Sequence, residues 1–130
     1  MSELVILDSS VWIEFFKGNP EYEFVDNILS TNTICTNEII LTELLPSIRK
    51  RREVKLERLI LSIEQTIMNI DWEEIRHFQL LALKNGFNNI NIPDLIIAQN
   101  CIQNDILLIS CDKHFDTITG FSSLRLQRVI

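Results

Sequence analysis

The chain has 130 residues, of which 46% are hydrophobic and 23% are charged, with only three Gly and three Pro. These proportions suit one compact domain over residues 1–130; they exclude a disordered chain and disfavour long flexible linkers. The net charge of −6 argues against a nucleic-acid partner, because phosphate contacts need Lys and Arg. It does not exclude one, because carboxylates clustered around a metal also make a chain acidic, and bound dications reverse the local field.

The start of the chain and its cysteines predict a cytoplasmic protein. Met1-Ser2-Glu3 leads directly into the apolar Leu4–Leu7, without the pattern of a signal peptide. No apolar run approaches the ~20 residues that span a bilayer, so no membrane association is expected. Cys35, Cys101 and Cys111 lack the paired spacing of a zinc site, and their apolar surroundings predict buried, reduced thiols.

Short apolar strands and helices alternate in the first half of the chain. A continuous apolar run predicts a buried strand, Gly18 predicts a helix end, and Pro20 a helix start. In chain order, we predict a strand at Leu4–Leu7, a helix at Val11–Lys17, a helix at Pro20–Ser30 and a strand at Thr33–Cys35. Thr36 or Asn37 then caps a helix that contains Glu43, and Pro46 is expected to kink or interrupt it.

The alternation continues through the second half. Asp71 with Glu74 resembles a capping box, Gly86 is a helix stop, and Pro93 suits a first helical position. We predict helices at Val54–Gln65, Trp72–Asn85 and Pro93–Asn104, a loop at Asn88–Ile92, and strands at Thr66–Ile70, Ile106–Ile109 and near Ser123–Leu126. This order predicts an α/β fold, a three-layer α/β/α sandwich around a mainly parallel sheet of four to five strands.

Four acidic residues follow strands or begin helices where such a sheet would bring them together. Asp8 and Asp112 come just after strands, and Glu43 and Asp94 lie on helices that follow strand-to-helix loops. Each has a simpler explanation alone: Asp8 as a helix cap, Glu43 as a partly exposed residue, Asp94 as helix-start chemistry and Asp112 as a loop residue. Ligands bind beyond the carboxyl ends of parallel strands, and a hard dication resolves the repulsion between converging carboxylates.

These acids stand in four motifs that resemble those of PIN-domain proteins, and the chain is most similar to the small VapC-type toxins of prokaryotic toxin–antitoxin pairs. The motifs are Leu7-Asp8-Ser9-Ser10, Leu41-Thr42-Glu43-Leu44, Pro93-Asp94-Leu95-Ile96-Ile97-Ala98 and Ser110-Cys111-Asp112-Lys113-His114-Phe115. The resemblance implies a PIN-like fold and a Mg²⁺- or Mn²⁺-dependent endoribonuclease that cleaves RNA with a metal-activated water. It also implies a homodimer and a cognate antitoxin.

By the same resemblance, Asp8, Glu43, Asp94 and Asp112 are the catalytic and metal-binding acids, and Ser10 and Ser110 are supporting hydroxyls. Asp116 ranks below them as an additional metal-binding acid. The chain has two histidines, His77 and His114. The first is expected to be structural or at the surface, and the second is expected to be a loop residue outside the catalytic set.

A basic run follows Glu43 at Arg49, Lys50, Arg51 and Arg52. One interpretation is a solvated helix end, where cations suit the helix dipole. The other is an RNA-binding edge that tracks phosphates, which Lys17 and Lys113 would extend.

Two alternative functions remain at this point. One is a catalytically inactive PIN-fold binding scaffold, which the intact set of acids disfavours. The other is a phosphorylatable receiver-like domain, which also gathers acids and Mg²⁺. A receiver favours adjacent acids after the first strand, whereas Asp8 has no acidic neighbour and Asp71 looks like a helix cap.

Overall fold

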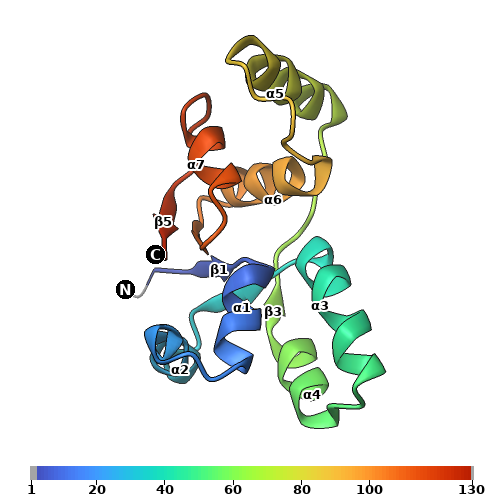
Figure 1. The fold of residues 1–130 in the computed structure, drawn as a ribbon, viewed down its shortest axis with the longest axis vertical. Helices are drawn as coiled ribbons and strands as arrows, with labels where there is room; N and C mark the ends of the chain where they lie inside the picture. Colours follow the sequence, from blue (N-terminus) through green and yellow to red (C-terminus); the bar gives the residue numbers. More distant parts are fainter. Residues whose placement is uncertain (1–2, 130) are drawn as a thin grey trace.

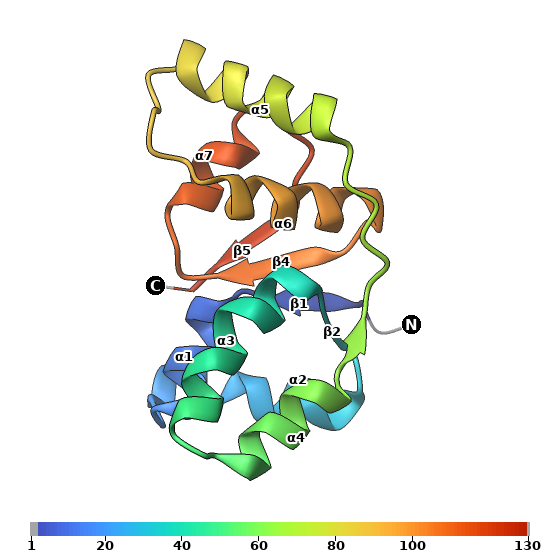
Figure 2. The same ribbon diagram turned by 90° about the vertical axis from the view of Figure 1, so that its right-hand side faces the viewer.

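The computed structural model describes residues 3–129 and shows a parallel sheet between two layers of helices (Figure 1 and Figure 2). The strands are β1 (Val5–Leu7), β2 (Ile34–Thr36), β3 (Glu64–Gln65), β4 (Leu107–Ser110) and β5 (Leu126–Arg128). Their order is β3-β2-β1-β4-β5, and every pair is parallel. The expected α/β/α fold is therefore confirmed, with an entirely parallel five-stranded sheet.

The helices divide between the two faces of the sheet (Figure 2). One layer contains α1 (Ser9–Phe16), η1 (Pro20–Tyr22), α2 (Phe24–Thr31), α3 (Glu38–Lys50) and α4 (Val54–Ser62). The other contains α5 (Trp72–Lys84), α6 (Ile92–Gln103) and α7 (His114–Thr119). Because helices cover both faces, all three residues of β1 are buried, which explains why that strand is continuously apolar.

The order of the strands places the functional end of the sheet. From β1 the chain builds outward to β2 and β3, and then returns to the other side of β1 with β4 and β5. The carboxyl ends of β1 and β4 are therefore neighbours at the point where the strand order reverses, which is the usual ligand position in such sheets. The Asp8 N–H donates to the Ile109 carbonyl at 3.0 Å, so Asp8 lies directly against β4.

The predicted strand at Thr66–Ile70 is wrong. The observed strand, β3, is shorter and ends at Gln65, before the predicted one begins. Side-chain amides of α6 hold this segment in place of a neighbouring strand. Asn100 Nδ2 donates to the Ile67 carbonyl at 3.0 Å, and Gln103 Nε2 donates to the Asn69 carbonyl at 2.9 Å. These bonds satisfy backbone acceptors that a strand would have used for its ladder.

The interruption expected at Pro46 is also wrong, because α3 continues through it and includes Arg49 and Lys50. A proline cannot donate to the carbonyl four residues earlier, here that of Thr42. Both Pro46 and Thr42 are exposed, so water can satisfy the carbonyl that the proline leaves without a partner.

Three other predicted elements need correction. The helix expected at Pro20–Ser30 divides into η1, capped by the Asn19 side chain, and α2. The strand expected near Ser123–Leu126 begins later, because the Leu124 N–H donates to the Ser122 hydroxyl in a turn. Finally, α7 forms where a loop was expected, and two of its own residues, Phe115 and Ile118, are fully buried.

Within residues 3–129, no helix is both long and apolar enough to cross a bilayer.

Cys35 and Cys101 are buried and Cys111 is half-buried, and none of the three is in a disulfide. Burial raises the pKa of the Cys101 thiol to about 12, so this side chain is a small uncharged core residue.

Candidate active site

Asp8 lies at the end of β1 with only 4% of its surface exposed. It occupies the residue before α1, but its side chain makes no capping hydrogen bond to that helix. Its Oδ2 instead accepts hydrogen bonds from Ser10 Oγ at 2.7 Å and Ser110 Oγ at 3.0 Å. Helix capping therefore does not explain this buried carboxylate. Two serine hydroxyls donate to the same carboxylate oxygen and fix its position.

The two serines lock the ends of β1 and β4 together. The Asp112 N–H donates to Ser110 Oγ at 2.9 Å, and the Cys111 N–H donates to Ser10 Oγ at 3.4 Å. A hydroxyl has one hydrogen to donate, so each serine accepts from the β4 loop and donates to Asp8. The two serines therefore fix the position of the Asp8 carboxylate relative to the backbone of Cys111 and Asp112.

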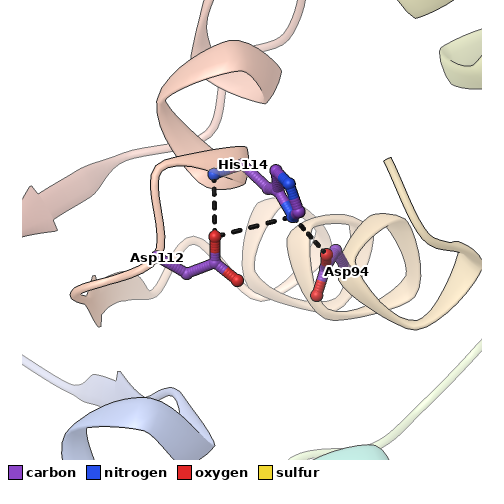
Figure 3. Close-up of side chains that lie close together, drawn as sticks. All are labelled: Asp94, Asp112 and His114. Carbon is purple, nitrogen blue, oxygen red and sulfur yellow. Dashed lines mark hydrogen bonds and ion pairs between the residues drawn. The ribbon is translucent and has the colours of Figure 1, made fainter. Parts of the chain in front are cut away.

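Asp94, Asp112 and His114 converge from three separate segments (Figure 3). They lie respectively in the first turn of α6, in the loop after β4 and at the first residue of α7. Nδ1 of His114 is 3.5 Å from Asp94 Oδ2 and 3.5 Å from Asp112 Oδ1. One potential ligand atom from each of the three side chains lies within 4.8 Å of the others.

The electrostatics of Asp94 show that it belongs to a larger acidic cluster. Asp94 is buried, with 9% of its surface exposed. Burial, followed by the charges of Asp112 and Asp8, raises the pKa of Asp94 to about 6, while His114 acts in the opposite direction. Asp94 is therefore harder to ionise than an ordinary aspartate, which helix-start chemistry does not explain.

Glu43 on α3 is coupled to the same cluster. Burial raises the pKa of the Glu43 carboxyl, and Asp8, Asp94 and Asp112 raise it further, while a hydrogen bond from Ser9 opposes them. The residue as a whole is exposed, as expected for a position at the edge of an apolar stripe, so its carboxyl is only partly shielded from water. The structure therefore brings the four acids together, with Glu43 at the most open side of the cluster.

Asp116 lies outside this cluster. Its carboxylate forms an ion pair with Arg128 of β5, and half of its side chain is exposed. It is not among the main causes of the raised pKa of Asp94 or Glu43. Asp116 therefore lies apart from the four acids in this structure, and its metal-binding role stays a prediction.

His114 lies closer to the acids than the sequence indicated. It was expected to be a loop residue outside the catalytic set, whereas it begins α7 and faces two of the acids. The available signal was the spacing of Asp112 and His114, because an Asp often accepts a hydrogen bond from the N–H two residues later. That bond is present at 2.9 Å and directs the chain back toward the acids.

A cavity of about 290 Å³ opens beside Glu43, between α1 and α3. It is lined by Ile13, Phe16, Lys17, Glu43, Leu44, Ser47, Ile48, Arg51 and Glu53. Arg51 is thus the member of the basic run that borders the space next to the acids. Arg51 pairs with Glu53 at 3.5 Å, and Arg49 pairs with Glu57 at 2.9 Å, so both arginines already have anionic neighbours.

The side chains of the cluster fit a hard dication. Three carboxylates in mutual repulsion supply the oxygen ligands that Mg²⁺ and Mn²⁺ favour. The His114 Nδ1 atom is buried and has no hydrogen-bond partner among the described residues, although it lies between two carboxylates. A cation bound there would relieve the repulsion and satisfy this nitrogen.

The chain belongs to the PIN-domain family, because the family model for the PIN domain matches residues 5–120. Members of this family are generally nucleases, and the match confirms the resemblance seen in the four acidic motifs. It also rules out the receiver-like alternative. Asp71, the residue that argued against a receiver, indeed caps α5 by accepting from the Glu74 N–H at 3.2 Å.

Solved structures share the fold at low sequence identity. DNA-bound VapBC from Salmonella typhimurium matches with a TM-score of 0.76 and 18% identity, over 99% of this chain and 100% of that chain. VapBC-1 from nontypeable Haemophilus influenzae matches with a TM-score of 0.75 and 20% identity, over 96% and 97%. VapBC-5 from Mycobacterium tuberculosis, a member of a toxin–antitoxin family, matches with a TM-score of 0.68 and 22% identity, over 98% and 100%. Among curated proteins, no similar sequence is found.

Proposed function

We propose that this chain is a divalent-metal-dependent endoribonuclease and the toxin of a toxin–antitoxin pair. The observation that carries the proposal is the convergence of Asp8, Glu43, Asp94 and Asp112 at the reversal point of the sheet. Their mutual repulsion suits a bound cation, and PIN domains are generally nucleases. An inactive scaffold would have no need to retain four acids at this cost.

The residues of the site have two proposed roles, metal binding and support of the metal-binding carboxylates. Asp8, Asp94 and Asp112 would hold Mg²⁺ or Mn²⁺, with Glu43 completing the set from the cavity side. When bound, the ion supplies positive charge that stabilises the phosphate transition state and activates a water. Ser10 and Ser110 keep the Asp8 carboxylate in one orientation, which preserves the site between turnovers.

RNA cleavage by the purified protein is expected to require Mg²⁺ or Mn²⁺, because no side-chain nucleophile is available among the acids. The measurement is the rate of cleavage of a labelled RNA in a metal-containing buffer, with excess chelator, and after the metal is restored. Chelation should abolish turnover and restored metal should recover it. Undiminished cleavage in chelator would rule out the metal mechanism, and no cleavage in any metal would favour the inactive scaffold.

We also propose a homodimer and an antitoxin partner in the cytoplasm. The support is the shared fold with VapBC structures and a set of exposed apolar side chains on α5, α6 and the loop between them: Leu80, Leu83, Phe87 and Ile92. A cavity of about 240 Å³ lies beside Leu83 and Phe87. A monomer mass in light scattering at micromolar concentration would contradict the dimer. Failure to bind the product of a neighbouring small reading frame would count against the antitoxin.

Replacing Arg51 and Arg52 by Gln is expected to weaken RNA binding while changing the chemical step little. Arg51 borders the cavity beside Glu43, so phosphates that pass there would contact it and its neighbour. The log–log salt dependence of binding should become shallower by roughly 0.7 per lost contact with single-stranded RNA. The measurement is a binding titration at several salt concentrations.

The matched control is the double replacement of Arg76 and Lys84 by Gln on α5, in the opposite helix layer. It removes the same charge from a surface away from the cavity, so its salt dependence should equal that of the wild type. If both double variants behave alike, the basic run is a solvated helix end, and the RNA follows another route.

A further inference from the structure

The His114 side chain is fixed beside the acids by the contacts of its neighbours, whereas an ordinary surface histidine points into water. Its backbone N–H donates to Asp112 Oδ1 at 2.9 Å, and the next residue of α7, Phe115, is fully buried. These contacts fix the start of the helix and direct the imidazole toward Asp94 (Figure 3). Nδ1 gives up contact with water there without gaining a hydrogen bond among the described residues.

The separations within this trio suit ligands of one ion. With metal–ligand bonds of about 2.1 Å, adjacent ligands of a six-coordinate ion lie about 3.0 Å apart and opposite ligands about 4.2 Å apart. Nδ1 is 3.5 Å from a carboxylate oxygen of Asp94 and 3.5 Å from one of Asp112, which falls between these limits. Shifts of less than about an ångström would bring all three atoms to one ion.

We propose that His114 is a nitrogen ligand of the metal centre, beside Asp94 and Asp112. The inference rests on the proposed function only in placing a dication among the acids. Its consequence is a preference among metals, because Mg²⁺ favours oxygen ligands whereas imidazole strengthens binding of first-row transition ions. The site therefore selects Mn²⁺ and Co²⁺ over Mg²⁺ more strongly than an all-carboxylate site does.

A competing role for His114 gives the opposite result. As a cationic counter-ion, the imidazole would offset the charges of Asp94 and Asp112 and compete with a metal for them. Removing it would then raise metal affinity. Removing a ligand lowers metal affinity, and lowers it more for Mn²⁺ than for Mg²⁺. The sign of the change separates the two roles.

The chain contains only two histidines, which makes a spectroscopic test specific. Pulsed electron paramagnetic resonance on the Mn²⁺-loaded full chain detects ¹⁴N nuclei bound to the ion. We expect a ¹⁴N coupling in the wild type, its loss in His114→Asn, and its retention in His77→Asn, which alters the other histidine on α5. Calorimetry should show Mn²⁺ binding weakened by about tenfold in His114→Asn, with a smaller change for Mg²⁺.

Wild-type protein that binds Mn²⁺ without a ¹⁴N coupling would overturn the inference, and this measurement does not depend on the folding of any variant. A coupling that persists in folded His114→Asn, or Mn²⁺ affinity that rises in that variant, would overturn it equally. If the protein cleaves RNA but no nitrogen binds the ion, the proposed function stands and the assignment of His114 as a ligand fails. If nitrogen binds the ion but RNA is not cleaved, the assignment stands and the proposed function fails. A chain that binds no Mn²⁺ would overturn both.

Discussion

Replacing Asp8, Asp94 or Asp112 by Asn is expected to reduce RNA cleavage by at least ~10²-fold, a loss of about 2.7 kcal/mol of transition-state stabilisation. Each change preserves size and removes one negative charge from the cluster that would hold the cation. In Asp8→Asn, the amide can still accept from Ser10 or Ser110, so the fold should survive. The measurement is single-turnover cleavage at saturating metal, with circular dichroism to verify folding.

Asp116→Asn is the matched control, because it makes the same chemical change in the same part of the chain. Its carboxylate pairs with Arg128 and is not among the main causes of the raised pKa of Asp94. Cleavage by Asp116→Asn should therefore remain within a fewfold of the wild type. Near-normal cleavage after any of the three cluster substitutions would remove that residue from the site, whereas a large loss in Asp116→Asn would return it to the metal-binding set.

Features determined by nearby sequence were predictable. The apolar run before Asp8 indicated β1, and the cap at Asp71 and the proline at Pro93 located the starts of two helices within a residue. β3 was not predictable in this way. Its two residues, Glu64 and Gln65, are polar and exposed, and they form a strand only because they pair with β2.

The candidate site shows the same division. Four acids could be selected because each follows a strand or begins a helix, and a parallel sheet gathers such positions at one edge. Asp116 could be ranked below the four acids, but its ion pair could not be predicted, because its partner Arg128 comes from β5 and the pair exists only in the folded chain. The position of His114 beside Asp94 and Asp112 could not be predicted for a related reason, since it depends on α7, a helix of six residues without a periodic signal.

The metal-free protein is expected to gain stability as the pH falls from about 7.5 toward 4, because of Asp94. The pKa of Asp94 is raised from 3.8 to about 6 in the folded state, so the folded chain binds this proton more tightly than the unfolded chain does. Above the folded pKa, the ionised carboxyl therefore opposes folding, at 1.36 kcal/mol per pKa unit, or about 3 kcal/mol in full. That cost is removed as the pH falls through about 6, and no further gain from Asp94 is expected below its unfolded pKa.

The substitution Asp94→Asn isolates this contribution from those of the other acids. The side chain is only 13% exposed, so solvent screening removes little of the effect. With chelator present, the variant should have a larger free energy of unfolding than the wild type at pH 7.5, by up to about 3 kcal/mol. The difference should disappear near pH 4, where the wild-type carboxyl is protonated in the folded state. Denaturant unfolding of both proteins across this pH range measures the difference directly, and Asp116→Asn, which loses an ion pair, should show no such gain. A variant that is less stable than the wild type at pH 7.5 would mean that Asp94 is not under repulsion in the metal-free protein, and the electrostatic argument for a cation at this cluster would lose its support.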